Sequence, residues 1–356
     1  GLVVHDVGAP SDDDTLTVDD SNGLISVIAA MMGGTATDEP AVDYLTDDVI
    51  AQARAYSDTA LVVIGSDGVE ASDFTREALA LTKNRIDLFD KVCANFDNVI
   101  VVVNAGNAME LGFLEQYPSI RAALWIGTPG PFGCSSLGRI LAGEVNPSGR
   151  LTDTYAYDAA GSPASVNFGD YKYDNIKGMS FINYSEGIYV GYRYYETRYL
   201  GDEAGYEAAV QFPFGYGLSY TAFDWAATDF AYDDETVSVE VLVTNTGGAA
   251  GKDVVQVYFS APYTAGGIEK SAIELAGYAK TKLLAPGESE AVTVRFPLRD
   301  LSSYDMETEQ AYVLEAGEYT IKVGRNVHDI VDAMPLTVAE TVVYRTDEVT
   351  GAAGTS

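Results

Sequence analysis

The sequence predicts an α/β sandwich domain followed by an all-β, immunoglobulin-like sandwich. From about residue 47 to 143, continuous apolar runs alternate with helix-like segments, which is typical of an α/β layer structure. After residue 223, apolar residues recur at every second position, as they do in half-buried strands. We therefore expect residues 1–148 to form the α/β sandwich, 149–223 a tyrosine-rich connection packing on the sandwich, 224–343 the β-sandwich, and 344–356 a linker or tail.

Three apolar runs in the first part are expected to be strands of a parallel sheet. They are Ala60–Ser66, Asn98–Gly106 and Ile120–Gly127, and their continuous, β-branched-rich character suits strands buried on both faces. Between the first two runs, the segment TKNRIDLFDKVCAN places apolar residues at helical spacing. Ligands on such sheets bind at the carboxyl ends of the strands. The loops expected to form a site therefore begin at Ser66, Ala105 and Gly127.

The middle of the chain lacks a clear period. Residues 149–223 are rich in Tyr, Gly and Asn, with GIYVGYRYYETRYL near their centre. We interpret them as a long connection held in place by packed tyrosines.

Alternating residues dominate the third part. Turn sequences such as NTGG and APGE separate short stretches of period two. Several strands of this kind within roughly 100 residues indicate an immunoglobulin-like module. The alternating positions are Val237, Val239, Val241 and Val243, then Val255, Val257 and Phe259, then Val292, Val294 and Phe296, and finally Tyr319, Ile321 and Val323.

The net charge of the chain limits the classes of molecule that it can bind. A formal net charge of −32 and a pI near 4.1 oppose binding to nucleic acid or to an anionic membrane, because like charges repel. A neutral ligand escapes this repulsion. Neither a membrane span nor a signal-peptide pattern is evident, so the sequence favours a cytoplasmic location.

Few residues are available for metal or nucleophilic chemistry. The chain has two cysteines, Cys93 and Cys134, which we expect to be small buried hydrophobes. It has two histidines, His5 and His328, which leaves histidine metal sites and Ser-His triads poorly supplied. No metal and no cofactor is therefore expected, and carboxylates must perform any chemistry.

Four strings resemble the C-terminal half of family 3 glycoside hydrolases of the β-glucosidase type. They are NPSGRLTDTY (146–155), YSEGIYVGYRYYET (184–197), FPFGYGLSYTAF (212–223) and VTNTGGAAGKDVVQVY (243–258), and they occur in the family's order. The string EAGEYTIKVGRN further on is similar to the family's fibronectin-III-like domain. The resemblance implies that the β-sandwich is this fibronectin-III-like domain.

The resemblance also implies a two-carboxylate retaining mechanism. In this family the nucleophile is an aspartate on a (β/α)8 barrel, and the acid/base is usually a glutamate on the α/β sandwich. No eight-fold strand and helix pattern occurs here, so the barrel is expected outside these residues, either fused or in trans. The linker-like end and the strings DTYAYD and NFGD resemble family members in which the barrel follows the fibronectin-like domain. The expected substrate is a β-glucoside or a related oligosaccharide.

Glu70 is the candidate general acid/base. It follows the strand ALVVIG in GSDGVEASDFTRE, where the family commonly has a Ser-Gly-Glu-Gly-type loop, although Val69 and Ala71 replace the small flanking residues. Asp73 and Arg76 are possible supporting residues that could tune Glu70 through charge and hydrogen bonding. The alternative is that Glu70 is an ordinary solvated loop carboxylate.

Two further residues have a structural and a functional interpretation. We interpret Glu186 as the carboxylate of a tight turn paired with Arg193, and catalysis is the alternative. We interpret Trp125 as a core residue, and a sugar platform is the alternative. For the whole chain, the competing function is a noncatalytic scaffold that binds carbohydrate or protein.

Overall fold

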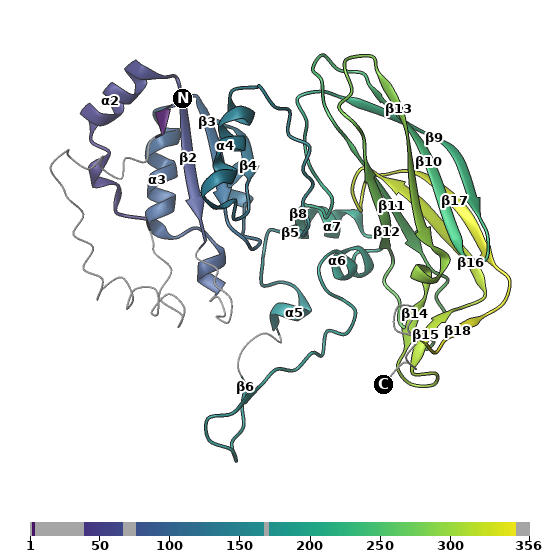
Figure 1. Cartoon of the computed structure of the whole chain (residues 1–356). Helices are drawn as coiled ribbons and strands as arrows, with labels where there is room; N and C mark the ends of the chain where they lie inside the picture. The colour runs from purple at the N-terminus through teal and green to yellow at the C-terminus, as the bar shows by residue number, and fades with distance from the viewer. Residues whose placement is uncertain (1, 4–38, 67–75, 167–170, 347–356) are drawn as a thin grey trace. The chain divides into compact units, whose positions relative to one another are not determined.

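The computed structural model describes residues 2–3, 39–66, 76–166 and 171–346. The chain divides into two compact units, one made of residues 1–137 with 155–160 and the other of residues 138–154 with 161–356. Both appear in Figure 1. The predicted fold class, an α/β layer followed by an all-β sandwich, is confirmed, whereas the predicted domain boundaries stay a prediction.

The first unit contains a parallel sheet in the order β1-β2-β3-β4. Its helices start where polar side chains cap them: Thr46 accepts from the Val49 N–H before α2, and Thr82 accepts from the Arg85 N–H before α3. The elements are β1 (Leu2–Val3), η1 (Val42–Tyr44), α2 (Asp47–Tyr56), β2 (Thr59–Gly65), η2 (Arg76–Leu79), α3 (Lys83–Cys93), β3 (Asn98–Asn104), η3 (Gly112–Glu115), β4 (Ile120–Trp125), α4 (Gly130–Leu141) and β5 (Tyr155–Ala156).

Burial in this sheet differs from the sequence expectation. β3 is the most buried strand, with Val99, Val101, Val102 and Val103 at most 1% exposed. β2 buries every second residue, and β4 leaves its central residues, Arg121 to Ala123, exposed. The expectation that all three runs are buried on both faces is therefore wrong for β2, where burial alternates, and for β4, the edge strand of the described sheet, because a strand face is buried only where other elements pack over it.

The expectation that both cysteines are buried is wrong. Cys93 is only half-buried at the end of α3, and Cys134 is exposed on α4. α4 lies on the surface for most of its length, so a small apolar residue on it is not drawn into a core.

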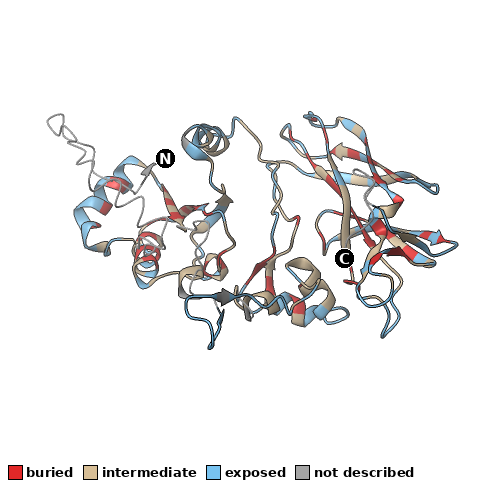
Figure 2. Cartoon of the chain, turned by 60° about the horizontal axis from the view of Figure 1, so that its bottom comes forward, coloured by how far each residue is buried: buried red, intermediate tan, exposed pale blue. Residues whose placement is uncertain are grey.

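The second unit is dominated by two antiparallel sheets, ordered β13-β10-β9 and β12-β11-β16-β17, with a smaller sheet β14-β15-β18. Figure 2 shows buried residues along these strands. The strands are β8 (Val210–Phe212), β9 (Phe223–Tyr232), β10 (Thr236–Asn245), β11 (Val254–Ser260), β12 (Glu274–Lys280), β13 (Ser289–Pro297), β14 (Ser303–Asp305), β15 (Ala311–Leu314), β16 (Gly317–Gly324), β17 (Ile330–Val338) and β18 (Val342–Tyr344), with η4 (Leu298–Leu301) between β13 and β14.

The core of this sandwich is made by the alternating residues expected from the sequence. The four valines of β10 are fully buried, and they pack with the inward residues of β11, β13 and β16. Burial of this many branched side chains is what stabilises the module.

The connection before the sandwich contains short elements only. They are α5 (Pro163–Val166), β6 (Tyr171–Lys172), β7 (Ser180–Phe181), α6 (Tyr192–Arg198) and α7 (Glu203–Ala209). None of the helices in the described ranges is long and apolar enough to span a bilayer.

Candidate functional site

The carboxyl ends of β2 and β3 are tied together by hydrogen bonds. The Ser66 N–H donates to the Asn104 carbonyl at 3.3 Å, and the Ser66 hydroxyl donates to Asn107 Oδ1 at 2.9 Å. Gly65 lies so close to the neighbouring strand that a Cβ there would meet the Asn104 carbonyl oxygen at 3.1 Å. The start of the loop after β2 is therefore fixed against the loop after β3.

The carboxyl-terminal end of the loop after β2 is also anchored on the loop after β3. Residues 67–75, which include Glu70 and Asp73, lie outside the described residues. The described residues resume at η2, where Arg76 is described by its backbone only. At the end of η2 the Leu79 carbonyl accepts from the Glu110 N–H at 2.8 Å. Both anchors of the Glu70 segment thus lie within residues 104–110.

The loop after β4 joins this edge through Trp125. Its indole Nε1 donates to the Ala105 carbonyl at 2.8 Å, and the side chain is half-buried. Gly127 has a φ of 60°, and a Cβ there would meet the indole ring of Trp125 at 3.6 Å. The three loops predicted from the sequence therefore meet at one edge of the sheet, and Trp125 helps to hold two of them together.

A shallow cavity of about 470 Å³ lies at the opposite edge of the sheet, beside the amino ends of β3 and β4. Burial raises the pKa of the Cys93 thiol there, and burial and the Asp90 carboxylate raise the pKa of Tyr117 to about 12. Neither group is therefore ionised near neutral pH. The cavity is lined by Asp90, Cys93, Asp97, Tyr117, Ser119 and Arg121.

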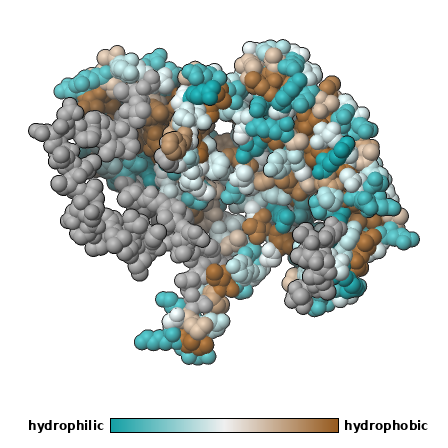
Figure 3. Space-filling model, viewed as in Figure 1, coloured by the Kyte–Doolittle hydropathy of each residue, from teal (hydrophilic) through white to brown (hydrophobic). Residues whose placement is uncertain are grey.

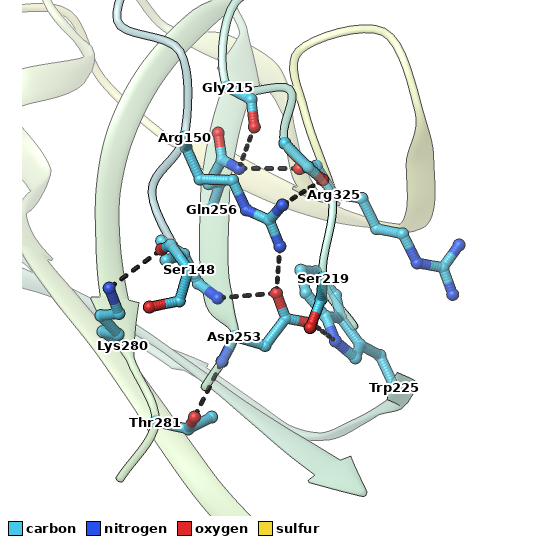
Figure 4. Close-up of polar contacts among 12 residues, drawn as sticks. Ser148, Arg150, Gly215, Ser219, Trp225, Asp253, Gln256, Lys280, Thr281 and Arg325 are labelled. Atoms are coloured by element: carbon cyan, nitrogen blue, oxygen red, sulfur yellow. Dashed lines mark hydrogen bonds and ion pairs between the residues drawn. The ribbon is translucent and has the colours of Figure 1, made fainter. Parts of the chain in front are cut away.

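Three of the four strings that resemble the glycosidase family meet in the second unit, around a buried ion pair (Figure 4). Arg150, from NPSGRLTDTY, donates to the Asp253 carboxylate and to the Gly217 carbonyl. Asp253 is 4% exposed and also accepts from Trp225 Nε1 at 2.9 Å. Its own N–H donates to the Thr281 hydroxyl at 3.0 Å. The pair joins the connection to the start of β11.

A second set of contacts attaches the connection to β11 three residues after Asp253, at Gln256. The Gln256 amide donates to the carbonyls of Gly215 and Arg325, at 3.1 and 2.7 Å, and its oxygen accepts from the Tyr258 hydroxyl at 2.6 Å. Gly215 has a φ of 82°, and a Cβ there would meet Gln256 Oε1 at 2.0 Å. The glycine-rich string FPFGYGLSY is therefore shaped by this close approach.

The string YSEGIYVGYRYYET also attaches to the β-sandwich. The Tyr192 hydroxyl accepts from the Leu275 N–H at 3.0 Å, and the Thr197 hydroxyl accepts from the Ala272 N–H at 2.8 Å. Arg193 pairs with Glu274 at 3.0 Å, whereas the sequence interpretation paired it with Glu186. Glu186 lies in a turn, and its backbone carbonyl accepts from the Tyr189 N–H.

His328 forms a fourth attachment, which no sequence pattern indicated. Its Nδ1 lies 3.1 Å from Glu196 on α6, and its Nε2 lies 3.1 Å from Glu203 on α7. The ring stacks on Tyr206 with a centroid distance of 3.8 Å. Hydrogen bonding to Glu196 is the main cause that raises the pKa of His328 to about 9, so the imidazole is protonated at neutral pH.

The pH dependence of stability provides a test of this contact. The folded-state pKa of about 9 lies above the ordinary 6.5, so the contribution of His328 is complete below pH 6.5 and is lost as the pH rises through 9. Urea unfolding should therefore show a free energy of unfolding that declines over this range, and His328→Gln should remove that part of the decline.

Proton NMR tests the same prediction directly, because the chain has only two histidines and His5→Gln assigns their signals. The groups facing His328 are Glu196, Glu203 and Tyr206, and burial raises the pKa of Tyr206, which stays neutral. A His328 signal that titrates near 6.5 would contradict the contact.

The described residues offer no group of three His, Cys, Asp or Glu side chains that could hold a metal ion. The sequence reasoning did not find the Arg150–Asp253 pair or the His328 contact, because their partners lie 103 and 132 residues apart along the chain. Only the burial of polar residues in the folded chain reveals them.

Comparison with known proteins matches the two parts of the chain to two family models. Residues 43–192 match the glycosyl hydrolase family 3 C-terminal domain, and residues 253–327 match the fibronectin type III-like domain. A β-glucosidase of Ruminococcus albus is 38% identical over 305 residues, which are 84% of this chain and 30% of that protein.

Solved structures agree with this match. A β-glucosidase from Paenibacillus barengoltzii has a TM-score of 0.75 and 33% identity, over 91% of this chain and 36% of that one. β-Glucosidase 3B from Thermotoga neapolitana, in complex with α-D-glucose, has a TM-score of 0.73 and 30% identity, over 92% of this chain and 45% of that one. The chain spans roughly a third of the length of the curated relatives that it matches. The chain therefore belongs to family 3 of the glycosyl hydrolases, and it contains that family's C-terminal domain followed by a fibronectin type III-like domain.

Proposed function

We propose that this chain is the part of a retaining β-glucosidase that supplies the acid/base carboxylate, Glu70, to a (β/α)8 barrel outside these residues. The barrel, fused or in trans, supplies the nucleophile. The substrate is a terminal β-linked glucose or a related sugar. The names of the relatives, which are β-glucosidases in R. albus and P. barengoltzii, support this substrate class.

One observation of the structure supports the role of Glu70 above the others. Ser66, before the segment that contains Glu70, and Leu79, after it, are both anchored on residues 104–110, from the last residue of β3 onward. Ligands of α/β sheets bind at this edge. A carboxylate in a segment anchored at this edge suits an acid/base that meets a sugar brought there by a second domain. Asp73 and Arg76 follow Glu70 within six residues and are proposed to tune its charge.

The chemistry assigned to Glu70 has two steps. As an acid it protonates the departing glycosidic oxygen while the barrel nucleophile forms the glycosyl-enzyme, and as a base it then activates the water that releases the sugar. In retaining enzymes the two carboxyl groups lie about 5–5.5 Å apart on opposite sides of the bond. Both carboxylates cannot come from one short loop, which is why Asp73 is assigned a supporting role.

The test compares this chain with a barrel-containing protein. The 356-residue chain should fold but should not hydrolyse aryl β-glucosides, because half of the carboxylate pair is absent. Adding the barrel, by fusion or as a separate protein, should produce hydrolysis with retention of configuration. Hydrolysis by the pure barrel-free chain would overturn the proposal. Oligosaccharide binding without hydrolysis in both proteins would favour a noncatalytic scaffold instead.

A further inference from the structure

The hairpin formed by β6 and β7 has one apolar face. Tyr171 pairs with Phe181 across the two strands, and the Tyr173 N–H donates to the Met179 carbonyl at 3.3 Å. Because side chains alternate between the faces of a strand, Tyr171, Tyr173, Met179 and Phe181 share one face. Their rings pack together, with centroid distances of 5.5 Å between Tyr171 and Phe181 and 4.8 Å between Tyr173 and Phe181.

This face is exposed. Tyr171, Tyr173, Met179 and Phe181 are 41%, 43%, 53% and 39% exposed. Hydrophobic atoms are visible at this hairpin in Figure 3, at the bottom of the view. A two-stranded hairpin in water is marginally stable unless its apolar face packs on something else. An apolar face of four large side chains is therefore expected to have a partner surface.

The chemistry of the face favours a protein as the partner. Aromatic residues and methionine are enriched at protein interfaces, and the flexible thioether of Met179 adapts to an irregular apolar surface. A sugar platform needs free ring faces, whereas Phe181 packs against both tyrosines. A second copy of this chain is disfavoured, because each copy has a formal net charge of −32 and the two would repel each other.

We propose that the apolar face of this hairpin is a docking surface for the part of the enzyme that lies outside these 356 residues, the barrel. The proposal rests on the proposed function, since that function requires a barrel. The relatives are about two and a half to three times as long as this chain, so a partner large enough to cover the face exists in proteins of this family. The hairpin itself does not add to the acidic charge: residues 171–181 contain Lys172, Asp174 and Lys177, a local net charge of +1.

Oxidative footprinting of the barrel-containing protein and of the 356-residue chain tests the proposal. Hydroxyl radicals should label Met179, Tyr173 and Phe181 in the chain alone, and labelling should fall several-fold in the barrel-containing protein. Met306 and Tyr278, which are 76% and 69% exposed on the fibronectin-like module, are the matched controls and should be labelled equally in both proteins. Equal labelling of the hairpin in both proteins overturns the proposal. Weak labelling in the chain alone also overturns it, because the cover would then lie within these residues.

A double variant, Tyr173→Lys with Phe181→Lys, provides the second measurement. It should leave the melting temperature of the 356-residue chain unchanged and lower that of the barrel-containing protein by about 2 °C or more. The polar-face variant Lys172→Ala should change neither. Loss of a dimer of the isolated chain, or of its binding to a soluble β-glucan, would identify a second copy or a sugar as the partner and overturn the proposal.

The readouts separate this proposal from the proposed function. Footprinting and melting measure coverage of the hairpin and do not depend on hydrolysis. A protected hairpin in a barrel-containing protein whose activity does not depend on Glu70 would support the docking surface and refute the catalytic role. An exposed hairpin in a Glu70-dependent enzyme would do the reverse.

Discussion

Glu70→Ala in the barrel-containing protein should lower the rate of hydrolysis of unactivated β-linked disaccharides by about 10²–10⁴-fold. This is the usual contribution of a positioned general acid or base. Aryl glucosides with acidic phenols need little protonation, so they should still form the glycosyl-enzyme, and its breakdown should then limit turnover. The measurement is a comparison of kcat/KM for the two substrate classes in the two proteins.

Chemical rescue gives this prediction its control. Azide should fill the space left by the missing carboxylate, attack without base assistance, restore turnover of the aryl glucoside and yield a β-glycosyl azide. Glu186→Ala is the comparison variant and should leave the rates on disaccharides near normal. If Glu70→Ala keeps near-normal rates on disaccharides, the acid/base lies elsewhere, and Glu186 becomes the next residue to test.

Arg150→Ala should lower the free energy of unfolding of the second unit by about 3–5 kcal/mol. Removing one partner of a buried ion pair leaves an uncompensated charge, here the Asp253 carboxylate, whose side chain is 5% exposed. The Gly217 carbonyl also loses its donor. Guanidinium unfolding followed by fluorescence measures the effect, and Trp125→Phe in the background leaves Trp225, which contacts Asp253, as the single tryptophan.

An exposed pair of the same type is the matched control. Arg345 pairs with Glu309 and its side chain is 63% exposed, so Arg345→Ala should cost no more than about 1 kcal/mol. Arg150→Lys should recover only part of the loss, because the guanidinium reaches its two acceptors through two separate nitrogens and lysine has one. Similar losses for Arg150→Ala and Arg345→Ala would contradict the importance of burial at Asp253.

The sequence predicted the fold class and the family well, because both depend on local patterns. The period-two valines of β10 are the buried residues of the sandwich, and the apolar run of β3 is the buried centre of the sheet. β4 was predicted less well. A run such as IRAALW has the composition of a buried strand, but its burial depends on which elements pack over its two faces, and a local pattern does not contain that information.

The contacts between distant segments could not be predicted from this sequence. Arg150 and Asp253, or His328 and Glu196, are ordinary charged residues in a chain with 74 charged residues, 53 acidic and 21 basic. Their pairing depends on the way the connection folds back on β11 and on the loop before β17. The role of Glu70 remains a proposal for a different reason, since its segment lies outside the described residues.

The chain crosses more than once between its two compact units, and this determines what happens when it is cut into two fragments. The chain passes from the first unit to the second at residue 138, returns for residues 155–160, and leaves again. A single peptide-bond cut after residue 160 would therefore leave Arg150 on the amino-terminal fragment and Asp253 on the other. The backbone bonds from Leu151 to Tyr216 and from Gly215 to Leu151 would also cross the cut. The two fragments would each retain half of a buried hydrogen-bonded surface, which is the condition for split halves to reassociate without a covalent link.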